Sequence, residues 1–320
     1  MRQCLIAAAI LWAAAGASLA QSFPSHPIKL VVGFAPAGAA DFVARTLSEP
    51  LSRALGQPVV IDNRPGAGSS IAAEYVAKSA ADGHTVLIAS PSSILVNPLL
   101  MKLGYDAKRD LVPVTKVSSS PLVVAVNPSV GAATLRELID AAKRRPGKLN
   151  FASSGNGSAP HLAAVLFVRL AGVDMVHVPY KGGGPAVQSV LAGDTQLSFA
   201  TPPSVLPLVQ AGRLRALAVT SRNRTPLVPG VPGMEEAGLP DYEISFWYGF
   251  FVPARTAREI VQKLYQETSK VLALPEVAKA LAREGTEVSG SRSPEDFAAF
   301  IAEDAKLWGR LVKDSGAKAD

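Results

Sequence analysis

Two glycine-rich segments, residues 33–41 and 153–161, combine small residues with a position directly after an apolar run. The first reads Gly-Phe-Ala-Pro-Ala-Gly-Ala-Ala-Asp, and the second reads Ser-Ser-Gly-Asn-Gly-Ser-Ala-Pro-His. Each leads into a helix-like stretch, and a helix N-terminus offers unpaired backbone N–H groups and the positive end of the helix dipole to an anion. The pair therefore predicts one carboxylate ligand gripped from two sides.

Backbone amides would have to supply this recognition, because neither segment contains Arg or Lys. A carboxylate that accepts three or four N–H bonds gains about 6 to 9 kcal/mol, from which the cost of association is subtracted. The balance corresponds to roughly micromolar affinity. The alternative is that the glycines only let the chain turn tightly between strand and helix.

The side chains of the two segments differ in their expected roles. Phe34 is expected to form an apolar wall, and Ser158 to offer its hydroxyl to the ligand or to cap a helix. Asp41 would repel an anion, so we expect it to cap a helix and pair with Arg45. For His161, two interpretations are equally good: a hydrogen-bond donor in the pocket, or a residue packed in the interior. The candidate ligand-binding residues here are Phe34, Ala37, Gly38, Ala39, Asp41, Ser154, Gly155, Asn156, Gly157, Ser158 and His161.

Further candidates follow or end other apolar runs, namely Ser90, Tyr180, Thr201, Trp247 and Tyr248. Ser90 could bond a ligand, although Ser-Pro-Ser-Ser is equally typical of a turn. Trp247 and Tyr248 could cover the ligand, and core packing is at least as good an interpretation of both. The loop at residues 180–184 is a third anion contact to consider, which we rank below the two glycine-rich segments.

Short β-branched runs alternate with Ala-rich amphipathic stretches along the chain, a pattern typical of an α/β fold with parallel sheets. Residues 223–240 are rich in Pro and Gly and indicate a long connection. Helices are expected in most of the gaps between strands. The predicted strands cover residues 28–32, 58–62, 85–89, 123–126, 149–152, 175–178, 196–200, 215–220 and 245–252.

The first twenty residues are typical of a secretory signal peptide. Arg2 precedes an uncharged run, and Ser18-Leu19-Ala20 fits the small-x-small rule at a cleavage site. A membrane anchor is the alternative, but the run is shorter than the roughly 20 apolar residues that a span needs. Cleavage would remove Cys4, so the mature chain would have neither disulfides nor thiol chemistry.

Length and charge narrow the class of protein. Removing 20 of the 320 residues leaves 300, more than one hydrophobic core usually serves, so two domains are expected. Removing Arg2 leaves 31 basic against 26 acidic residues, a net charge of +5. This excess is spread along the chain, which argues against nucleic acid as a partner. A mild positive field would still help to collect anionic solutes.

Motifs for catalysis and for cofactors are missing from the sequence. Gly-x-Ser-x-Gly does not occur, and Ser158 and His161 have no evident acid partner, so a secreted hydrolase is disfavoured. The four histidines show no zinc-ligand spacing, and there is neither a phosphate-binding Gly-x-x-x-x-Gly-Lys loop nor a dinucleotide fingerprint. We therefore expect a binding protein without metal or cofactor.

Several stretches together resemble a single family, and they run through nearly the whole mature chain. The chain is similar to Bug-type (TctC-like) extracytoplasmic solute receptors, the soluble binding component of tripartite tricarboxylate transporters. The matching stretches are residues 27–32, the first glycine-rich segment through Arg45, Asp-Asn-Arg-Pro-Gly-Ala-Gly at 62–68, Ala-Asp-Gly-His-Thr at 81–85, the second segment through Leu162, Tyr-Lys-Gly at 180–182 with Pro185, residues 214–220, and Trp-Tyr-Gly at 247–249.

The resemblance implies an α/β periplasmic-binding-protein fold of the two-crossover (type II) kind, with a ligand cleft between two lobes. Domain 1 would comprise residues 23–125 plus 244–320, and domain 2 residues 126–243. The strands at 123–126 and 244–252 would then cross the hinge, and the two glycine-rich segments would come from opposite lobes. Ligands of this fold type lie at the carboxyl ends of strands, where both segments begin.

The resemblance also implies a periplasmic receptor, expected to be a monomer, that captures a small mono- or dicarboxylate for the large and small membrane subunits of a transporter. A sensory role, with delivery to a membrane two-component kinase, is the alternative. Ala37 replaces a glycine that the family usually has, and Ala200-Thr201 follows Phe199 where many relatives have Asp, which disfavours an amino-acid ligand. A tight turn explains one glycine-rich segment alone, but two in a secreted chain with this pattern favour ligand binding.

Overall fold

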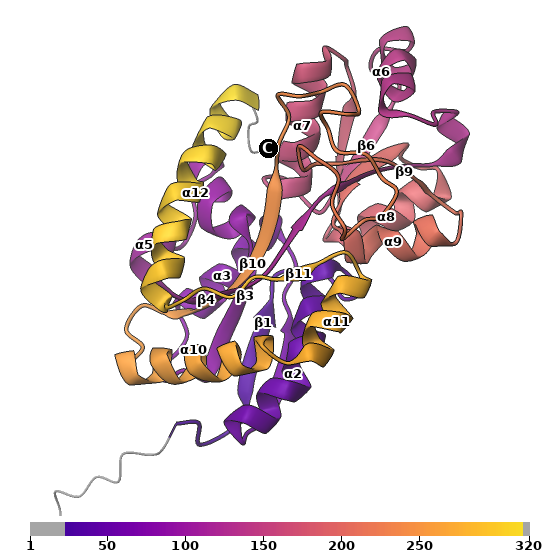
Figure 1. Cartoon of the computed structure of the whole chain (residues 1–320). Helices are drawn as coiled ribbons and strands as arrows, with labels where there is room; N and C mark the ends of the chain where they lie inside the picture. Colours follow the sequence, from indigo (N-terminus) through magenta and orange to yellow (C-terminus); the bar gives the residue numbers. More distant parts are fainter. Residues whose placement is uncertain (1–22, 316–320) are drawn as a thin grey trace, which may run out of the picture.

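The computed structural model describes residues 23–315, which form two α/β lobes (Figure 1). The predicted signal peptide, residues 1–20, lies outside the described residues. No helix within the described part of the chain has the length and apolar character needed to cross a membrane.

Lobe 1 is built on a six-stranded sheet, in which β1 pairs in parallel with β2 and β3 while β10 is antiparallel to β3 and β4. Its strands are β1 (Ile28–Val32), β2 (Val59–Asn63), β3 (Thr85–Ala89), β4 (Leu111–Pro121), β10 (Ser245–Pro253) and β11 (Glu287–Val288). Their order across the sheet is β11-β4-β10-β3-β1-β2.

Lobe 2 is built on a five-stranded sheet, in which β6 pairs in parallel with β7 and β8 while β5 is antiparallel to β8 and β9. Its strands are β5 (Val123–Val126), β6 (Asn150–Ser153), β7 (Val176–Pro179), β8 (Leu197–Ala200) and β9 (Arg215–Val219). Their order is β7-β6-β8-β5-β9. The expected α/β class is therefore present in both lobes.

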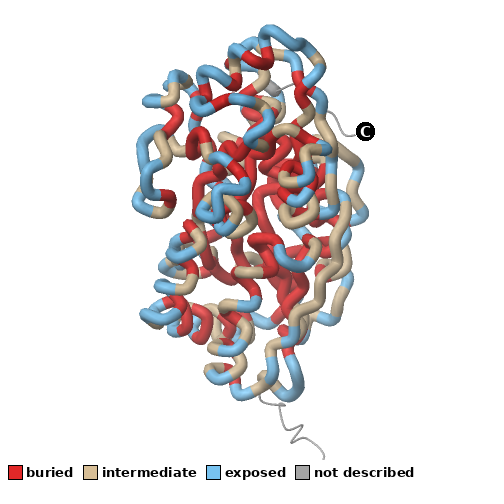
Figure 2. The backbone as a smooth tube through the Cα atoms, turned by 90° about the vertical axis from the view of Figure 1, so that its right-hand side faces the viewer, coloured by how far each residue is buried: buried red, intermediate tan, exposed pale blue. Residues whose placement is uncertain are grey.

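Helices cover the faces of both sheets, and buried residues fill the interior of each lobe (Figures 1 and 2). Lobe 1 and its edges hold α2 (Ala39–Leu55), η1 (Ala67–Ser69), α3 (Ser70–Ala77), η2 (Ser92–Val96), α4 (Asn97–Leu100), α5 (Ala107–Asp110), α10 (Arg258–Leu272), α11 (Pro275–Arg283) and α12 (Pro294–Ser315). Lobe 2 holds η3 (Pro128–Val130), α6 (Leu135–Arg144), α7 (Ala159–Ala171), α8 (Gly183–Ala192) and α9 (Pro202–Gln210).

Two long helices show how the lobes are covered. Helix α2 buries Val43, Leu47 and Leu51, which share one face because they are four residues apart, and it packs against α10 and α11. Helix α12 packs on β4 with Trp308 fully buried, and it also contacts α7 of lobe 2 (Figure 1). The C-terminal helix therefore touches both lobes.

Strand β4 is the longest strand of the described residues, and the sequence did not predict it. It contains Pro113 and a run of three serines instead of the continuous apolar run that marked the other strands. Proline is normally excluded from a strand with neighbours on both sides. Here the pairing with β10 shifts register between Phe250 and Phe251, where Phe251 lies opposite Pro113, so the ladder tolerates the missing N–H group.

The two connections between the lobes meet at Thr220. Its backbone N–H donates to the Leu122 carbonyl at 2.9 Å, and its carbonyl accepts from the Ile244 N–H at 3.0 Å. Its hydroxyl accepts from the Leu122 N–H and donates to the Ile244 carbonyl, both at 2.7 Å. The expected crossing strands are corrected accordingly: β5 lies wholly in lobe 2 and β10 wholly in lobe 1, so the chain changes lobe at Leu122 and between Thr220 and Ile244.

Candidate ligand-binding site

A cavity lies between the lobes, where strands from both sheets end and helices begin. It is lined by Phe34, Gly38, Ala39, Ala40, Ser154, Pro160, Gly183, Ala186, Ser198, Phe199, Ala200, Thr201, Phe246 and Tyr248. About 400 Å³ of space between atoms surrounds it, part of it continuous with solvent, but the volume of the cavity itself is only about 20 Å³. That is room for one or two waters, so an organic acid can enter only when the lobes or the lining side chains move apart.

The N-termini of α2 and α8 lie next to each other, and both line this cavity. Gly38 is the N-cap of α2, and a Cβ atom on it would lie 3.6 Å from the backbone nitrogen of Gly184 and 3.7 Å from that of Gly183. Between the same loops, the Ala35 N–H donates to the Lys181 carbonyl at 3.1 Å. Two sets of helix-terminal amides, one from each lobe, are therefore close enough to bind a single anion.

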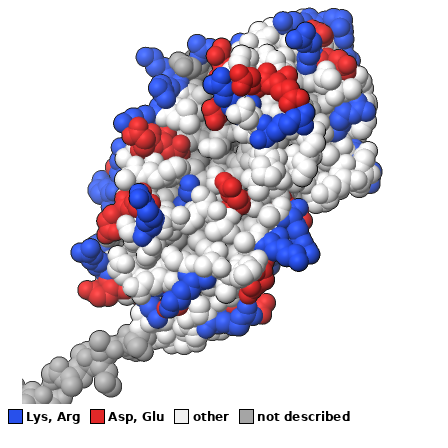
Figure 3. Space-filling model, viewed as in Figure 1, with Lys and Arg blue, Asp and Glu red and all other residues white. Residues whose placement is uncertain are grey.

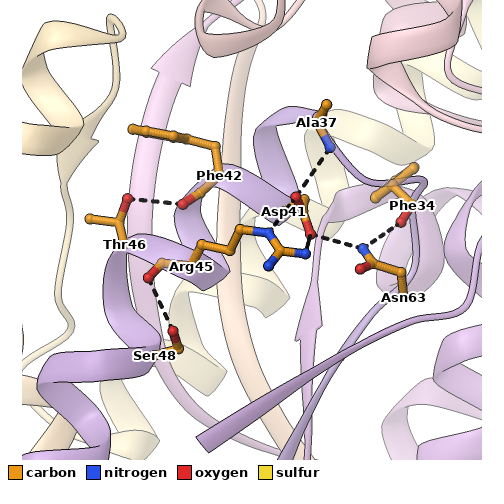
Figure 4. A network of polar contacts seen from close by, with 8 residues as sticks. All are labelled: Phe34, Ala37, Asp41, Phe42, Arg45, Thr46, Ser48 and Asn63. Atoms are coloured by element: carbon orange, nitrogen blue, oxygen red, sulfur yellow. Dashed lines mark hydrogen bonds and ion pairs between the residues drawn. The ribbon is translucent and has the colours of Figure 1, made fainter.

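Asp41 holds the first glycine-rich segment in shape. Its carboxylate accepts from the Ala37 N–H at 3.1 Å, from the Asn63 amide at 3.1 Å and from the Arg45 guanidinium at 2.8 and 3.0 Å (Figure 4). The Asn63 amide also donates to the Phe34 carbonyl at 3.0 Å. Asp41 lies in the first turn of α2, so the expectation that it is the N-cap is wrong, whereas the expected pairing with Arg45 is confirmed.

Two opposing effects set the charge of Asp41. Burial raises the pKa of its carboxyl group, but the hydrogen bonds from Arg45, Ala37 and Asn63 together outweigh burial and lower the pKa below its ordinary value of 3.8. Asp41 is therefore ionised near neutral pH, and its charge is already compensated by its own neighbours. This arrangement supports the conformation of Ala37, which has a φ of 63°, a value that costs a residue with a Cβ about 1 kcal/mol.

Parts of the second glycine-rich segment pack against regions of lobe 1 other than the first segment. A Cβ atom on Gly157 would lie 2.1 Å from the Asn97 Oδ1 atom, and one on Gly155 would lie 3.5 Å from the Gly68 nitrogen. The Ala159 N–H donates to the Ser92 hydroxyl of lobe 1 at 3.0 Å. Both segments nevertheless reach the cavity, since Gly38 of the first and Ser154 of the second line it, and the loop at residues 180–184 adds Gly183.

No charged side chain lines the cavity, and most of its surface is apolar. Two of its four hydroxyls are already engaged, because Ser198 donates to the Ala152 carbonyl at 2.9 Å and Thr201 bonds Ser204 at 3.0 Å. The groups that can hydrogen-bond an anion here are therefore backbone N–H groups and the remaining hydroxyls. On the outer surface, basic and acidic residues are interspersed over the face shown in Figure 3.

The comparisons with known proteins agree with this geometry. A sequence model of the family described as "Tripartite tricarboxylate transporter family receptor" matches residues 43–317. The chain is also 38% identical over 301 residues to Protein BugT of Bordetella pertussis, which covers 93% of this chain and 92% of that protein. The chain belongs to this receptor family. Its members are solute-binding receptors and not enzymes.

Two solved structures from Rhodopseudomonas palustris are similar to the receptor over most of its length. One, with adipate, has a TM-score of 0.88 at 34% identity and covers 93% of this chain and 99% of its own. The other, MatC with bound malate, has a TM-score of 0.85 at 31% identity and covers 91% of this chain and 100% of its own. The expected two-lobed periplasmic-binding-protein fold is therefore confirmed.

The structure separates the candidate residues of the receptor into two groups. Those that line the cavity are Phe34, Gly38, Ala39, Ser154, Thr201 and Tyr248. Those that do not are Ala37, Asp41, Ser90, Gly155, Asn156, Gly157, Ser158, His161, Tyr180 and Trp247. Eight further lining residues were not named individually as candidates. Ala40 and Pro160 lie within the two glycine-rich segments and Gly183 in the loop at residues 180–184, and the others are Ala186, Ser198, Phe199, Ala200 and Phe246.

Candidates outside the lining have other contacts. Ser158 is the N-cap of α7 and accepts from the His161 N–H at 3.3 Å. The His161 ring accepts from the Gly157 N–H at 3.2 Å and stacks on His177 at 3.9 Å, so it is a packed residue. Trp247 donates its indole N–H to Asp304 at 2.7 Å. Of the remaining candidates, Ser90 is fully buried and Tyr180 packs on the core of lobe 2.

His26, Asp82 and His84 lie together in lobe 1, away from the cavity, with one possible ligand atom from each within 4.8 Å of the others. The Ser25 N–H donates to the His84 Nε2 atom at 3.1 Å, so in the neutral ring the proton is on Nδ1. The Nδ1 atom lies 3.4 Å from the Asp82 carboxylate but makes no hydrogen bond, and a protonated nitrogen cannot ligate a metal. This cluster therefore does not suit a metal ion as it stands.

Proposed function

We propose that the receptor is a periplasmic solute-binding protein that captures a small carboxylate and delivers it to the membrane subunits of a tripartite tricarboxylate-type transporter. The observation that carries the proposal is that the N-termini of α2 and α8, one from each lobe, both line an uncharged cavity. Backbone amides at helix N-termini suit a carboxylate, and the relatives with adipate and malate are consistent with one.

Capture would proceed by closure of the two lobes. We propose that lobe 2 moves as a body about Leu122 and the segment beyond Thr220, which gives domain boundaries close to those expected from the sequence. A ligand that contacts both helix N-termini binds the closed form better than the open form, and this difference in affinity drives closure. Residues 1–20 would direct the chain to the periplasm before cleavage.

Native mass spectrometry of freshly purified protein would identify a retained acid, and Gly38→Asp then tests where it binds. Gly38 has a φ of −94°, and a Cβ atom on it makes only ordinary contacts, so the variant should fold. Asp is a favoured N-cap, so its carboxylate would occupy the N–H groups of α2 that the ligand needs. Losing two charge-assisted bonds of about 1.5 to 3 kcal/mol each weakens binding more than a hundredfold.

Gly309→Asp is the matched control. It adds the same charge on α12, where a Cβ atom would have no neighbour within 4 Å. Calorimetric titration should show unchanged binding for the control and loss of binding for Gly38→Asp, while the thermal stability of both stays at or above that of the parent. Equal affinity of Gly38→Asp and the parent would show that the carboxylate does not lie on α2.

A further inference from the structure

We propose that the ligand of this receptor has a single carboxylate and an uncharged far end that hydrogen-bonds to the hydroxyl of Tyr248. The inference rests on the proposed function and names the class of acid: a monocarboxylate with a hydroxyl or carbonyl group away from its carboxylate. This class differs from the dicarboxylates adipate and malate of the two relatives. The evidence is the orientation of Tyr248, its lack of a partner, and the absence of charge around the cavity.

The alternation of β10 directs Tyr248 into the cavity. Phe246 and Tyr248 both line the cavity, while Trp247 between them packs against Phe297 on the opposite side of the sheet. Phe246 meets the Tyr248 ring edge-on, with 4.9 Å between ring centroids. Tyr248 pairs with Ser118 of β4, so its position is held by the sheet as well as by the aromatic contact.

Only 6% of Tyr248 is exposed, but its hydroxyl is not fully enclosed and has no hydrogen-bond partner within residues 23–315. Buried tyrosine hydroxyls usually have a partner, so one that is left free on a cavity wall marks a place where a ligand bonds. Burial raises the pKa of this phenol far above its ordinary value. Tyr248 is therefore neutral, and it both donates and accepts one hydrogen bond.

The absence of charge excludes a second carboxylate on the ligand. No Lys or Arg lines the cavity, and the guanidinium of Arg45 beside the first loop is committed to Asp41. A second carboxylate enclosed without a cation or a set of amides loses more hydration than one phenol hydroxyl returns. An uncharged hydroxyl or carbonyl has a much smaller hydration to lose, and a single bond from Tyr248 satisfies it. Phe34, Phe199 and Phe246 suit an apolar middle section.

Matched acids of equal length test the inference, with calorimetric titration of the full mature chain as the assay. The set is a monocarboxylate, its ω-hydroxy derivative and the corresponding dicarboxylate, from four to eight carbon atoms; the six-carbon members are hexanoate, 6-hydroxyhexanoate and adipate. At the best length we expect the hydroxy acid to bind about tenfold more tightly than the plain acid, and the dicarboxylate to bind more weakly than both.

Tyr248→Phe removes only the hydroxyl. Because that hydroxyl has no partner among the described residues, the variant should fold as stably as the parent. We expect it to bind the plain and the hydroxy acid equally. Tyr265→Phe on α10, whose hydroxyl bonds the Ser291 carbonyl at 3.3 Å, is the control and should keep the tenfold preference.

Each result decides the inference. Tighter binding of the dicarboxylate, or a preference for the hydroxy acid that survives in Tyr248→Phe, overturns it. If the dicarboxylate binds best and Gly38→Asp abolishes that binding, the inference fails while the proposed function stands. If no acid of any length binds, the proposed function fails and the inference fails with it.

Discussion

Gly157→Ala should weaken ligand binding by preventing the lobes from closing fully, although Gly157 does not line the cavity. A Cβ atom at this position would lie 2.1 Å from the Asn97 Oδ1 atom of lobe 1, and contacts of this kind are essentially never shorter than 3.0 Å. Either Asn97 or lobe 2 must therefore move by about 1 Å. The clash exists only when the lobes are together, so it raises the free energy of the closed form and leaves the open form unchanged.

The contacts of Asn97 set the magnitude. Its side-chain amide donates to the Ala67 carbonyl at 2.9 Å and to the Ser70 hydroxyl at 2.7 Å, and Asn97 is fully buried. Displacing it gives up about two neutral hydrogen bonds of roughly 1 kcal/mol each. Because closure is coupled to binding, a penalty of about 2 kcal/mol corresponds to roughly thirtyfold weaker affinity.

A second effect of the substitution has to be separated from the first. Gly157 has a φ of 68°, and alanine in this conformation costs about 1 kcal/mol in the open and the closed form alike. Gly172→Ala is the matched control, since Gly172 has a φ of 61° at the other end of α7 and no atom lies within 4 Å of its Cβ position. Both variants should lose similar stability, but only Gly157→Ala should lose affinity.

Calorimetric titration with the retained acid measures the affinity, and small-angle scattering measures closure as a fall in the radius of gyration on saturation. The loss caused by Gly157→Ala should shrink to a few-fold in an Asn97→Ala background, where the clashing atom is gone. The reasoning is refuted if Gly157→Ala binds within threefold of the parent and closes to the same radius. In that case the contact between Gly157 and Asn97 is no part of the ligand-bound state.

Three further predictions follow from single residues. Thr220→Val should lower the free energy of unfolding by about 2 to 4 kcal/mol in urea titrations, because the backbone groups of Leu122 and Ile244 lose a buried hydrogen-bond partner. Thr220→Ser keeps the hydroxyl and should cost under about 1 kcal/mol. Equal costs for the two variants would contradict the role of the hydroxyl in joining the two lobe connections. Asp41→Asn should lower the free energy of unfolding by about 1 to 2 kcal/mol at neutral pH. The difference from the parent should fade as the pH falls below 3.8, because the pKa of Asp41 is lowered in the folded state and protonation removes the stabilisation by its charge. A difference in stability that persists at pH 2 would show that the charge of Asp41 is not its cause. Intact-mass measurement of periplasmic protein should show a chain that begins at Gln21, and a full-length membrane-bound form would contradict the signal peptide.

Local patterns in the sequence were sufficient for most of the secondary structure. All nine predicted strands are present with ends shifted by at most one residue, because β-branched apolar runs have a strong local preference for strands in buried sheets. Strand β4 has no such run, and its conformation comes from β10 and β11, which pair with it from distant parts of the chain. Strand β4 could therefore be identified only from the tertiary structure.

The composition of the site was also visible in the sequence, but its pairing was not. Small residues and glycines after apolar runs identify helix N-termini that can accept an anion, and the segments at Gly38, Gly155 and Gly183 all have this character. Which N-termini face each other depends on how one lobe sits on the other. That placement sets the α2 terminus against Gly183 and leaves Gly155 against Gly68.

Trp247 and Tyr248 show the same limit at the level of one strand. Successive side chains along a strand point to opposite sides of the sheet, and both sides of β10 are buried. The sequence alone determined that one of the two aromatic residues would face each way. Only the packing of α12 on one side and of lobe 2 on the other decided that Trp247 bonds Asp304 and that Tyr248 lines the cavity between the lobes. The physical reason is that apolar character marks burial, while the identity of the burying surface comes from residues far away in the chain.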